Sequence, residues 1–354
     1  MNIDDLRDIT MANSISSFEE GVAGIIKDKV EDYSDEIIYD GLGSIIACQN
    51  IKSDGPRLGI ATHMDEVGFI VRSIDERGFI KLQMFGGFWS HMLPDQMFKV
   101  ITRKGKCFTG IMGSVASHGL SKELKEKVIP FDDLYLDMGV SSAKELEDLG
   151  VRVGDMVVPY SEFDHMANPK YLRCKAFDNR IGVMVGIEVL KRLHQKDHAP
   201  IYFACTVQEE PGLRGARTAT HITAPDLCIA IDTTLAGDTP LNDNITRLGG
   251  GVSLSMIDSV SIAHRGLVKY VEKLAKEKNI PFQYSVFNGG GTDSGNIHKS
   301  LAGVINMTLS IPIRYMHTNR SIIHTDDVEA CIDLLSELFM TLDNATFNQI
   351  CGEE

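Results

Sequence analysis

Histidines and carboxylates lie just after several short apolar segments of this sequence, and one further aspartate opens a helical segment. They are His63 and Asp65 after LGIAT (58–62), Glu209 and Glu210 after IYFACTV (201–207), Asp232 after LCIAI (227–231), Asp178 in KAFDNRIG, and His317 after NMTLSIPIRYM. Imidazole and carboxylate groups together suit zinc, cobalt or manganese better than calcium or magnesium. If these segments meet in the fold, their residue types predict a metal centre.

The number of candidates fits two metal ions. Two ions need about three protein ligands each, and one carboxylate can bridge both. Asp178 as the bridge, His63 and Asp232 on one ion, and Glu210 and His317 on the other meet that requirement. The sequence therefore predicts two divalent ions per chain, with zinc as the first expectation and cobalt or manganese as alternatives.

Two acidic residues remain beside these ligands. Glu209 precedes Glu210 and is the right type of residue to act as a general base on water activated by the ions. Asp65, two residues after His63, could hold the second ring nitrogen of that histidine. Two adjacent carboxylates after a buried strand are costly without a cation, and this favours the metal hypothesis.

Each residue taken alone has a plainer interpretation. An aspartate after a strand or at the start of a helix, such as Asp232 or Asp178, is more often a turn former or a cap. A lone His317 is more often an exposed or satisfied histidine, and a His-x-Asp pattern such as His63 with Asp65 arises by chance. The hypothesis therefore depends on the combination and not on any single member.

The elements around the candidates predict an α/β fold. Four continuous apolar runs, at 58–62, 201–207, 227–231 and 303–311, suit strands buried on both faces of a parallel sheet. Between them lie stretches that are apolar at helical spacing, such as FDNRIGVMVGIEVLKRLHQ, which Asp178 opens. This order predicts a mixed, largely parallel sheet sandwiched by helices. The carboxyl ends of such strands line one crevice, where the candidates would converge.

The middle of the chain has a different sequence pattern. Short β-rich pieces broken by glycine and polar turns, such as FIVRSID and KCFTGIMG, occupy residues 69–165 with little helical pattern. We interpret them as an inserted small β-barrel domain. Residues 1–68 and 166–354 would then form the catalytic α/β domain.

Composition excludes several classes of protein. The chain has 354 residues, 43% of them hydrophobic, and a formal net charge of −14, which disfavours nucleic acid and anionic membranes as partners. The N-terminus MNIDDLRDIT lacks the layout of a signal peptide. The seven cysteines form no CxxC pair, so neither a disulfide framework nor a cysteine zinc site is expected. A cytoplasmic location is the expectation.

The segments also resemble a known family. ATHMDEVGFIV, KAFDNRIG, VQEEPGLRGA, AIDTT, GGGTDSG and RYMHT are similar to those of the glutamyl and deblocking aminopeptidases, in the expected order from His63 to His317. These are the TET-type metallo-aminopeptidases, which assemble into tetrahedral dodecamers. The resemblance implies a zinc-exopeptidase fold, an inserted barrel that mediates dimerisation and assembly, and removal of N-terminal residues from short peptides.

The resemblance also implies roles for the candidates. Its ligands would be His63, Asp178 and Asp232 on one ion and Asp178, Glu210 and His317 on the other, with Glu209 as the base and Asp65 as support for His63. The segment 289–292 would form a loop at the substrate pocket, with Gly290, Gly291 and Thr292 as substrate-binding residues.

The sequence departs from the family pattern at two places. Pro211 stands where the family has a small apolar residue, and TNRSIIHTDD after His317 is less typical of it. Three further functions stay compatible with the residues. Glu209 with Asp232 could form the carboxylate pair of a glycan hydrolase, which needs no metal. The chain could also be a two-metal acyl-amino-acid hydrolase, or a shell-forming protein without catalytic activity.

Overall fold

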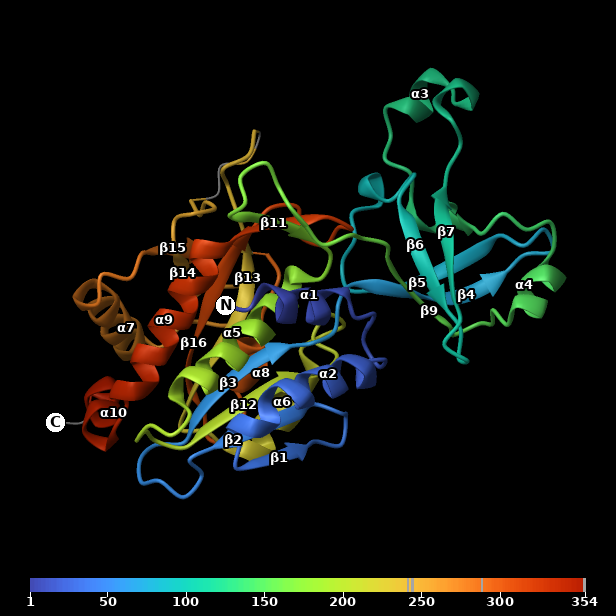
Figure 1. The fold of residues 1–354 in the computed structure, drawn as a ribbon. Coiled ribbons are helices and arrows are strands. Elements are labelled where there is room, and N and C mark those ends of the chain that lie inside the picture. Colours follow the sequence, from blue (N-terminus) through green and yellow to red (C-terminus); the bar gives the residue numbers. More distant parts are fainter. Residues whose placement is uncertain (241, 243–244, 288, 353–354) are drawn as a thin grey trace.

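The computed structural model describes residues 1–240, 242, 245–287 and 289–352, and it consists of a helix-covered sheet with a smaller barrel beside it (Figure 1). The larger part is built on one eight-stranded sheet. Its strands lie in the order β1 (Glu36–Tyr39), β2 (Ile45–Gln49), β12 (Ile201–Thr206), β3 (Leu58–His63), β13 (Leu227–Leu235), β16 (Ile305–Ile313), β14 (Val252–Ile257) and β15 (Phe282–Val286).

The four strands at the centre of this sheet are parallel. β3 pairs in parallel with β12 and with β13, and β13 pairs in parallel with β16. β2 and β14 are antiparallel to their inner neighbours. The predicted mixed, largely parallel sheet is therefore confirmed. Because the central strands share a direction, the residues at their carboxyl ends meet at one edge.

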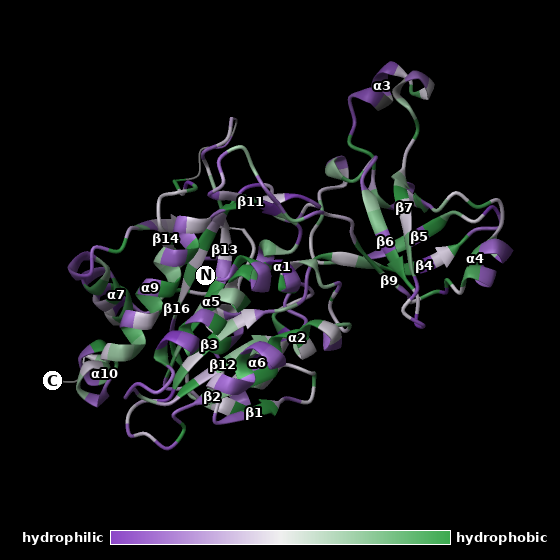
Figure 2. Ribbon diagram, in the orientation of Figure 1, coloured by the Kyte–Doolittle hydropathy of each residue, from purple (hydrophilic) through white to green (hydrophobic). Residues whose placement is uncertain are grey.

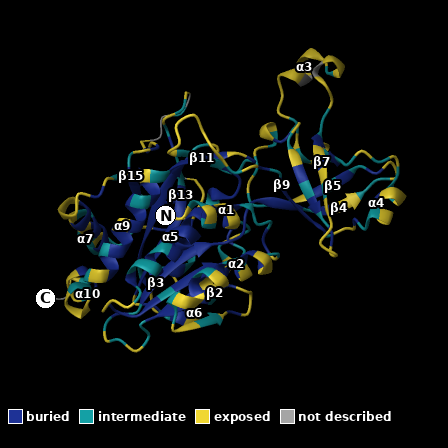
Figure 3. Ribbon diagram, in the orientation of Figure 1, coloured by how far each residue is buried: buried dark blue, intermediate teal, exposed yellow. Residues whose placement is uncertain are grey.

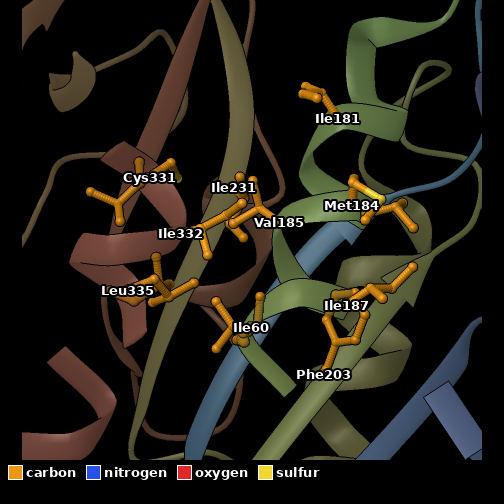
Figure 4. Close-up of a cluster of buried hydrophobic side chains, with 14 of the residues drawn as sticks. Ile60, Ile181, Met184, Val185, Ile187, Phe203, Ile231, Cys331, Ile332 and Leu335 are labelled. Carbon is orange, nitrogen blue, oxygen red and sulfur yellow. The ribbon is translucent and has the colours of Figure 1, made fainter. Parts of the chain in front are cut away.

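One face of the sheet carries the main hydrophobic core. The helices that contribute to this core are α1 (Ile3–Met11), α2 (Glu20–Val30), α5 (Phe177–Leu193), α7 (Arg265–Glu277), α9 (Thr325–Thr341) and α10 (Asn344–Cys351). Figure 4 shows α5 and α9 packing on the strands, with Val185 of α5 and Ile332 of α9 close to Ile60 and Ile231. Burying a side chain of this size contributes about 1.5–3 kcal/mol each, so this face supplies much of the stability.

The other face is lined by smaller residues, and it is covered by α6 (Arg214–Thr223) and α8 (Ser294–Ile297). Ala61, Ala230 and Cys228 lie in this second core with Ile297 of α8. Alternation of side chains along each strand explains the difference, since Ile60 faces the main core and Ala61 faces this one. Figure 3 shows the strands buried between exposed outer helix surfaces.

The smaller part is a closed barrel, and the expected inserted β-barrel is confirmed. Its strands follow the order β4 (Gly68–Ile74), β5 (Ile80–Phe85), β8 (Tyr135–Asp137), β7 (Cys107–Gly113), β6 (Met97–Ile101) and β9 (Met156–Pro159), with helices α3 (Lys122–Lys125) and α4 (Ala143–Leu149) attached. Phe69, Phe98 and Val157 are fully buried inside it. Figure 2 shows the hydrophobic residues concentrated in both cores and the polar ones on α3 and α4.

The barrel joins the larger part next to the end of β3. β4 starts only five residues after His63, and a small sheet of β10 (Asp164–His165), β11 (Tyr171–Cys174) and β17 (Ser321–His324) follows β9. The exact domain limits, 1–68 with 166–354 and 69–165, stay a prediction. Among the described helices, none has the length and apolar character needed to cross a membrane.

Candidate metal centre and active site

Five segments bring the ligand candidates to the carboxyl edge of the central strands. His63 is the last residue of β3, Glu209 and Glu210 follow β12, Asp232 lies in β13, Asp178 lies at the start of α5, and His317 lies in the loop after β16. Strand β13 continues to Leu235, so the expectation that it ends before Asp232 was wrong by four residues. Asp178 has non-helical backbone angles, φ −79° and ψ 105°, so the regular helix begins after it.

Asp178 lies between the two histidines. Its Oδ1 atom is 3.3 Å from His63 Nε2, and its Oδ2 atom is 3.3 Å from His317 Nε2. Asp232 Oδ1 is 4.0 Å from His63 Nε2, and Glu210 Oε2 is 3.7 Å from His317 Nε2. One carboxylate thus faces both imidazoles, which is the geometry that a bridging ligand requires.

The ligand atoms form two groups with the spacing of metal sites. One group is His63, Asp178 and Asp232, and the other is Asp178, Glu210 and His317; in each, the atoms lie within 4.8 Å of one another. Two nitrogen and four oxygen positions, with Asp178 shared, match a pair of zinc-like ions. These are the groups that the sequence predicts.

Glu209 and Asp65 lie beside these groups and not in them. Glu209 is 8% exposed, and its Oε2 atom is 3.8 Å from His63 Nε2. Asp65 is completely buried, with Oδ1 3.5 Å from Nδ1 of His63, on the side of the ring away from Asp178. The same ring nitrogen lies 3.1 Å from the backbone oxygen of Asp65. The Asp65 residue thereby fixes the ring, so that Nε2 faces the cluster.

Asp65 also holds the backbone that carries the glutamate pair. The backbone N–H of Glu209 donates to its Oδ1 at 3.1 Å, and that of Glu210 donates to its Oδ2 at 3.3 Å. Ser16 donates its hydroxyl hydrogen to Oδ2 at 2.6 Å. Sequence reasoning missed Ser16, because nothing in the sequence links it to a residue 49 positions away.

The glycines of the β5–β6 connection were also missed. His317 Nδ1 lies 2.6 Å from the backbone oxygen of Gly87, which orients this second imidazole. A Cβ atom on Gly86, whose φ is +73°, would lie 2.5 Å from Glu210 Oε2. The adjacent glycines in FGGFWS were the available signal, since paired glycines mark close backbone approach. The barrel connection therefore contacts two ligand candidates.

Burial and neighbouring charges shift the pKa values of the cluster. Burial raises the pKa of Glu209 and of Asp232 well above their ordinary values, and it raises the pKa of Glu210 to about 7. Burial opposes protonation of His317, but the charges of Glu210 and Asp178 raise its pKa to about 10. Burial also opposes ionisation of Asp178, yet its hydrogen bonds with the two histidines lower its pKa. Such crowded carboxylates are stabilised by cations.

An unsatisfied buried oxygen supports a metal at this position. Glu210 Oε1 is buried and has no hydrogen-bond partner among the described residues. An orphaned carboxylate oxygen is costly, and a metal ligand bond would satisfy it. The donor set and this oxygen both fit divalent ions.

The cluster opens into a cavity of about 500 Å³. Gly290, Gly291 and Thr292 line it, as the prediction of a pocket loop requires. The Thr292 hydroxyl donates to Asp258 Oδ2 at 3.1 Å and lies 3.0 Å from the Thr308 hydroxyl, so it anchors the loop to the sheet. The cavity is large enough for one or two amino-acid residues beside the cluster.

Comparison with known proteins identifies a family. The family model described as M42 glutamyl aminopeptidase matches residues 43–334. The FrvX protein of Escherichia coli is 35% identical over 97% of this chain and 96% of its own. The glutamyl aminopeptidase of Lactococcus lactis is 33% identical, covering 92% of both chains. The lysyl aminopeptidase of Pyrococcus furiosus is 31% identical over 95% of this chain and 96% of its own.

Solved structures agree with this match. The TET aminopeptidase of a marine sediment Thaumarchaeota archaeon superposes with a TM-score of 0.95, at 36% identity and covering 98% of both chains. The TET1 peptidase of Pyrococcus horikoshii, described as assembling into a tetrahedron or a large octahedral shell, has a TM-score of 0.86 and 30% identity, covering 96% of this chain and 99% of its own.

Proposed function

This chain belongs to the M42 glutamyl aminopeptidase family, and from this premise we propose that it is a two-metal aminopeptidase that removes N-terminal residues from short peptides. The position of Asp178 carries the proposal. Its two carboxylate oxygens each lie 3.3 Å from a different histidine, so one residue completes two ligand groups. A glycan hydrolase would have no use for either histidine.

We assign the metal ligands as the sequence predicts. His63, Asp178 and Asp232 would hold one ion, and Asp178, Glu210 and His317 the other. Zinc suits these donors best, and cobalt or manganese could replace it. Bound there, two divalent ions would polarise the scissile carbonyl and acidify the attacking water.

Glu209 is the proposed general base. It lies outside both ligand groups, is nearly buried, and has a pKa that burial raises well above its ordinary value. A carboxylate in this position would take a proton from the attacking water and pass it to the leaving amine. The surrounding carboxylates attract the cationic N-terminus of a peptide, which explains exopeptidase action. Asp65 would keep His63 oriented, and Gly290, Gly291 and Thr292 would line the substrate pocket.

We also propose a self-assembled form and a cytoplasmic location. The TET1 relative assembles into closed shells, and the barrel here is a separate unit able to carry such contacts. A dodecamer would admit only short, unfolded peptides to its interior. All seven cysteines are free thiols, which supports a reducing compartment.

Chelation tests the function. The protein is treated with chelator, and turnover of a panel of aminoacyl p-nitroanilides and short peptides is measured before and after adding Zn, Co or Mn. We expect activity to be lost to chelator, restored by metal, and absent on N-blocked peptides. Hydrolysis of N-acylated amino acids alone would favour the acyl-amino-acid hydrolase, and glycan cleavage insensitive to chelator would favour the glycosidase. No hydrolysis with any metal would favour a non-catalytic shell.

A further inference from the structure

The cavity beside the cluster has a second charged feature. Besides the ligand candidates, it is lined by Phe287, Asn296 and Lys299, the last two at and just after α8. Lys299 is the one lysine or arginine among its lining residues. Its side chain is exposed, and it has no hydrogen-bond or ion-pair partner within the described parts of the chain. An unpaired cation therefore faces a cavity whose other charged groups are acidic or histidine.

Asp258, which also lines the cavity, already accepts hydrogen bonds on both of its oxygens. Asp258 Oδ1 accepts from the backbone N–H groups of Val260 and Ser261 at 2.8 and 2.6 Å, and Oδ2 accepts from the hydroxyls of Ser261 and Thr292 at 2.8 and 3.1 Å. These four bonds build the turn beneath the glycine loop. Asp258 is thus held away from an ion pair with Lys299, which stays available to a ligand.

A second hollow is lined by the same lysine as the first. It has a volume of about 840 Å³ and shares Asn296 and Lys299 with the active-site cavity. Arg217 and His221 of α6 also line it, and Arg217 is exposed without a described partner.

The acidic residue of the second hollow is also satisfied. Asp40 accepts three backbone N–H groups at 2.8–2.9 Å on one oxygen and the Thr218 hydroxyl on the other. Lys299 and Arg217 face one carboxylate among the lining residues, so this hollow has a local excess of positive charge in a chain whose net charge is −14. Such a patch attracts anionic groups against the field of the whole protein.

We propose that Lys299 recognises a carboxylate of the peptide substrate; this rests on the proposed aminopeptidase function. Lys299 attracts a carboxylate of the peptide and repels its cationic amine, so that the amine points towards the ligand groups in the same cavity. A dipolar peptide is thereby aligned with its first peptide bond near Glu209 and a carboxylate at the junction of the two cavities. That carboxylate is either the side chain of an acidic first residue or the C-terminus of a di- or tripeptide.

Two matched substrate pairs distinguish these sources. Glu-p-nitroanilide against Gln-p-nitroanilide isolates the side-chain carboxylate, and Leu-Gly-Gly against its C-terminal amide isolates the chain end. The readout is the ratio of kcat/KM within each pair, measured on the metal-loaded full chain. The variants are Lys299→Met, which keeps length and removes charge, Lys299→Glu, and Lys273→Met as a control on α7, away from both cavities.

We expect at least one ratio to favour the carboxylate in the wild type by about five- to tenfold. That ratio falls towards one in Lys299→Met, inverts in Lys299→Glu and stays unchanged in Lys273→Met. If only the Glu/Gln ratio changes, Lys299 recognises the side-chain carboxylate. If only the ratio of Leu-Gly-Gly to its amide changes, Lys299 recognises the C-terminus. Ratios identical in wild type and Lys299→Met overturn the inference while leaving the aminopeptidase intact. A wild type that cleaves other members of the aminoacyl panel but none of these four substrates overturns this inference alone, and one that cleaves no member of the panel overturns the proposed function with it.

Discussion

Ser16 donates its hydroxyl hydrogen to Asp65 across 2.6 Å, although 49 positions separate the two residues in the chain. Asp65 in turn faces His63 and accepts the backbone N–H groups of Glu209 and Glu210. The N-terminal segment thereby supports a ligand candidate and the proposed base through one carboxylate.

Removing the Ser16 hydroxyl should weaken metal binding at the proposed centre. Ser16→Ala leaves Asp65 Oδ2 with one donor fewer in a completely buried position, and hydrogen bonds to charged groups contribute about 1.5–3 kcal/mol. We expect zinc affinity to fall roughly tenfold, as for other residues that orient ligands, measured by competition with a chromogenic chelator. Ser73→Ala, at an exposed position of β4, is the control. Equal zinc affinity in both variants would contradict the proposed support.

A substitution in the β5–β6 connection should weaken the binding of one ion more than that of the other. In Gly86→Ala, the new Cβ would approach Glu210 Oε2 at 2.5 Å and Val67 Cγ1 at 2.6 Å, so the Glu210 side chain must move. We expect metal content, measured by atomic emission after dialysis, to fall from two ions per chain towards one, with at least a tenfold loss of kcat. Gly105→Ala is a matched control, because its φ of +75° carries the same strain but its Cβ meets nothing within 4 Å. If both variants keep two ions, Gly86 is only a turn residue.

Substitutions of the two neighbouring glutamates should have different effects on turnover and on metal content. Glu209→Gln keeps the shape of the side chain but cannot accept a proton, so kcat should fall by about 10²–10⁴-fold. Its metal content should stay at two ions, since Glu209 lies outside both ligand groups. Glu210→Gln should instead lose metal, because this residue belongs to the second group. Full activity in Glu209→Gln would refute its role as base.

Stability of the metal-free chain should depend on pH through Asp327. Its two oxygens accept the backbone N–H groups of Gly249 and Gly251 at 2.8 and 2.7 Å, but burial raises its pKa to about 7. An acid whose pKa is raised in the folded state binds its proton more tightly there than in the unfolded chain. Its contribution is thus present below the unfolded value, 3.8, and is lost as pH rises through about 7.

Urea unfolding in the presence of chelator measures this contribution. The difference in unfolding free energy between wild type and Asp327→Asn should shrink between pH 4 and pH 7, by at most about 1.4 kcal/mol per pH unit. A difference that grows over this range would mean that the charged carboxylate is the form preferred in the folded state.

The sequence by itself determined the central strands and the candidate residues near their carboxyl ends, although it ended β13 four residues too early. Continuous apolar runs identified β3, β12, β13 and β16, and parallel strands necessarily bring their carboxyl ends to one edge. The residue types after those runs, together with Asp178 at the start of a helix, were therefore enough to predict the two groups of candidate ligands that lie together in the structure, with Glu209 beside them. The insertion was legible for a similar reason, because a change of periodicity marks a change of architecture.

Only the tertiary structure decided which distant groups hold and surround these residues. The pairing of Ser16 with Asp65, the approach of Gly86 to Glu210 and the position of Lys299 between two cavities all join segments far apart in the chain. Ser16, Gly86 and Lys299 belong to no periodic pattern, and by type they are ordinary surface or turn residues. Periodicity reports which way a side chain faces within its own element, whereas these contacts depend on how separate elements pack together.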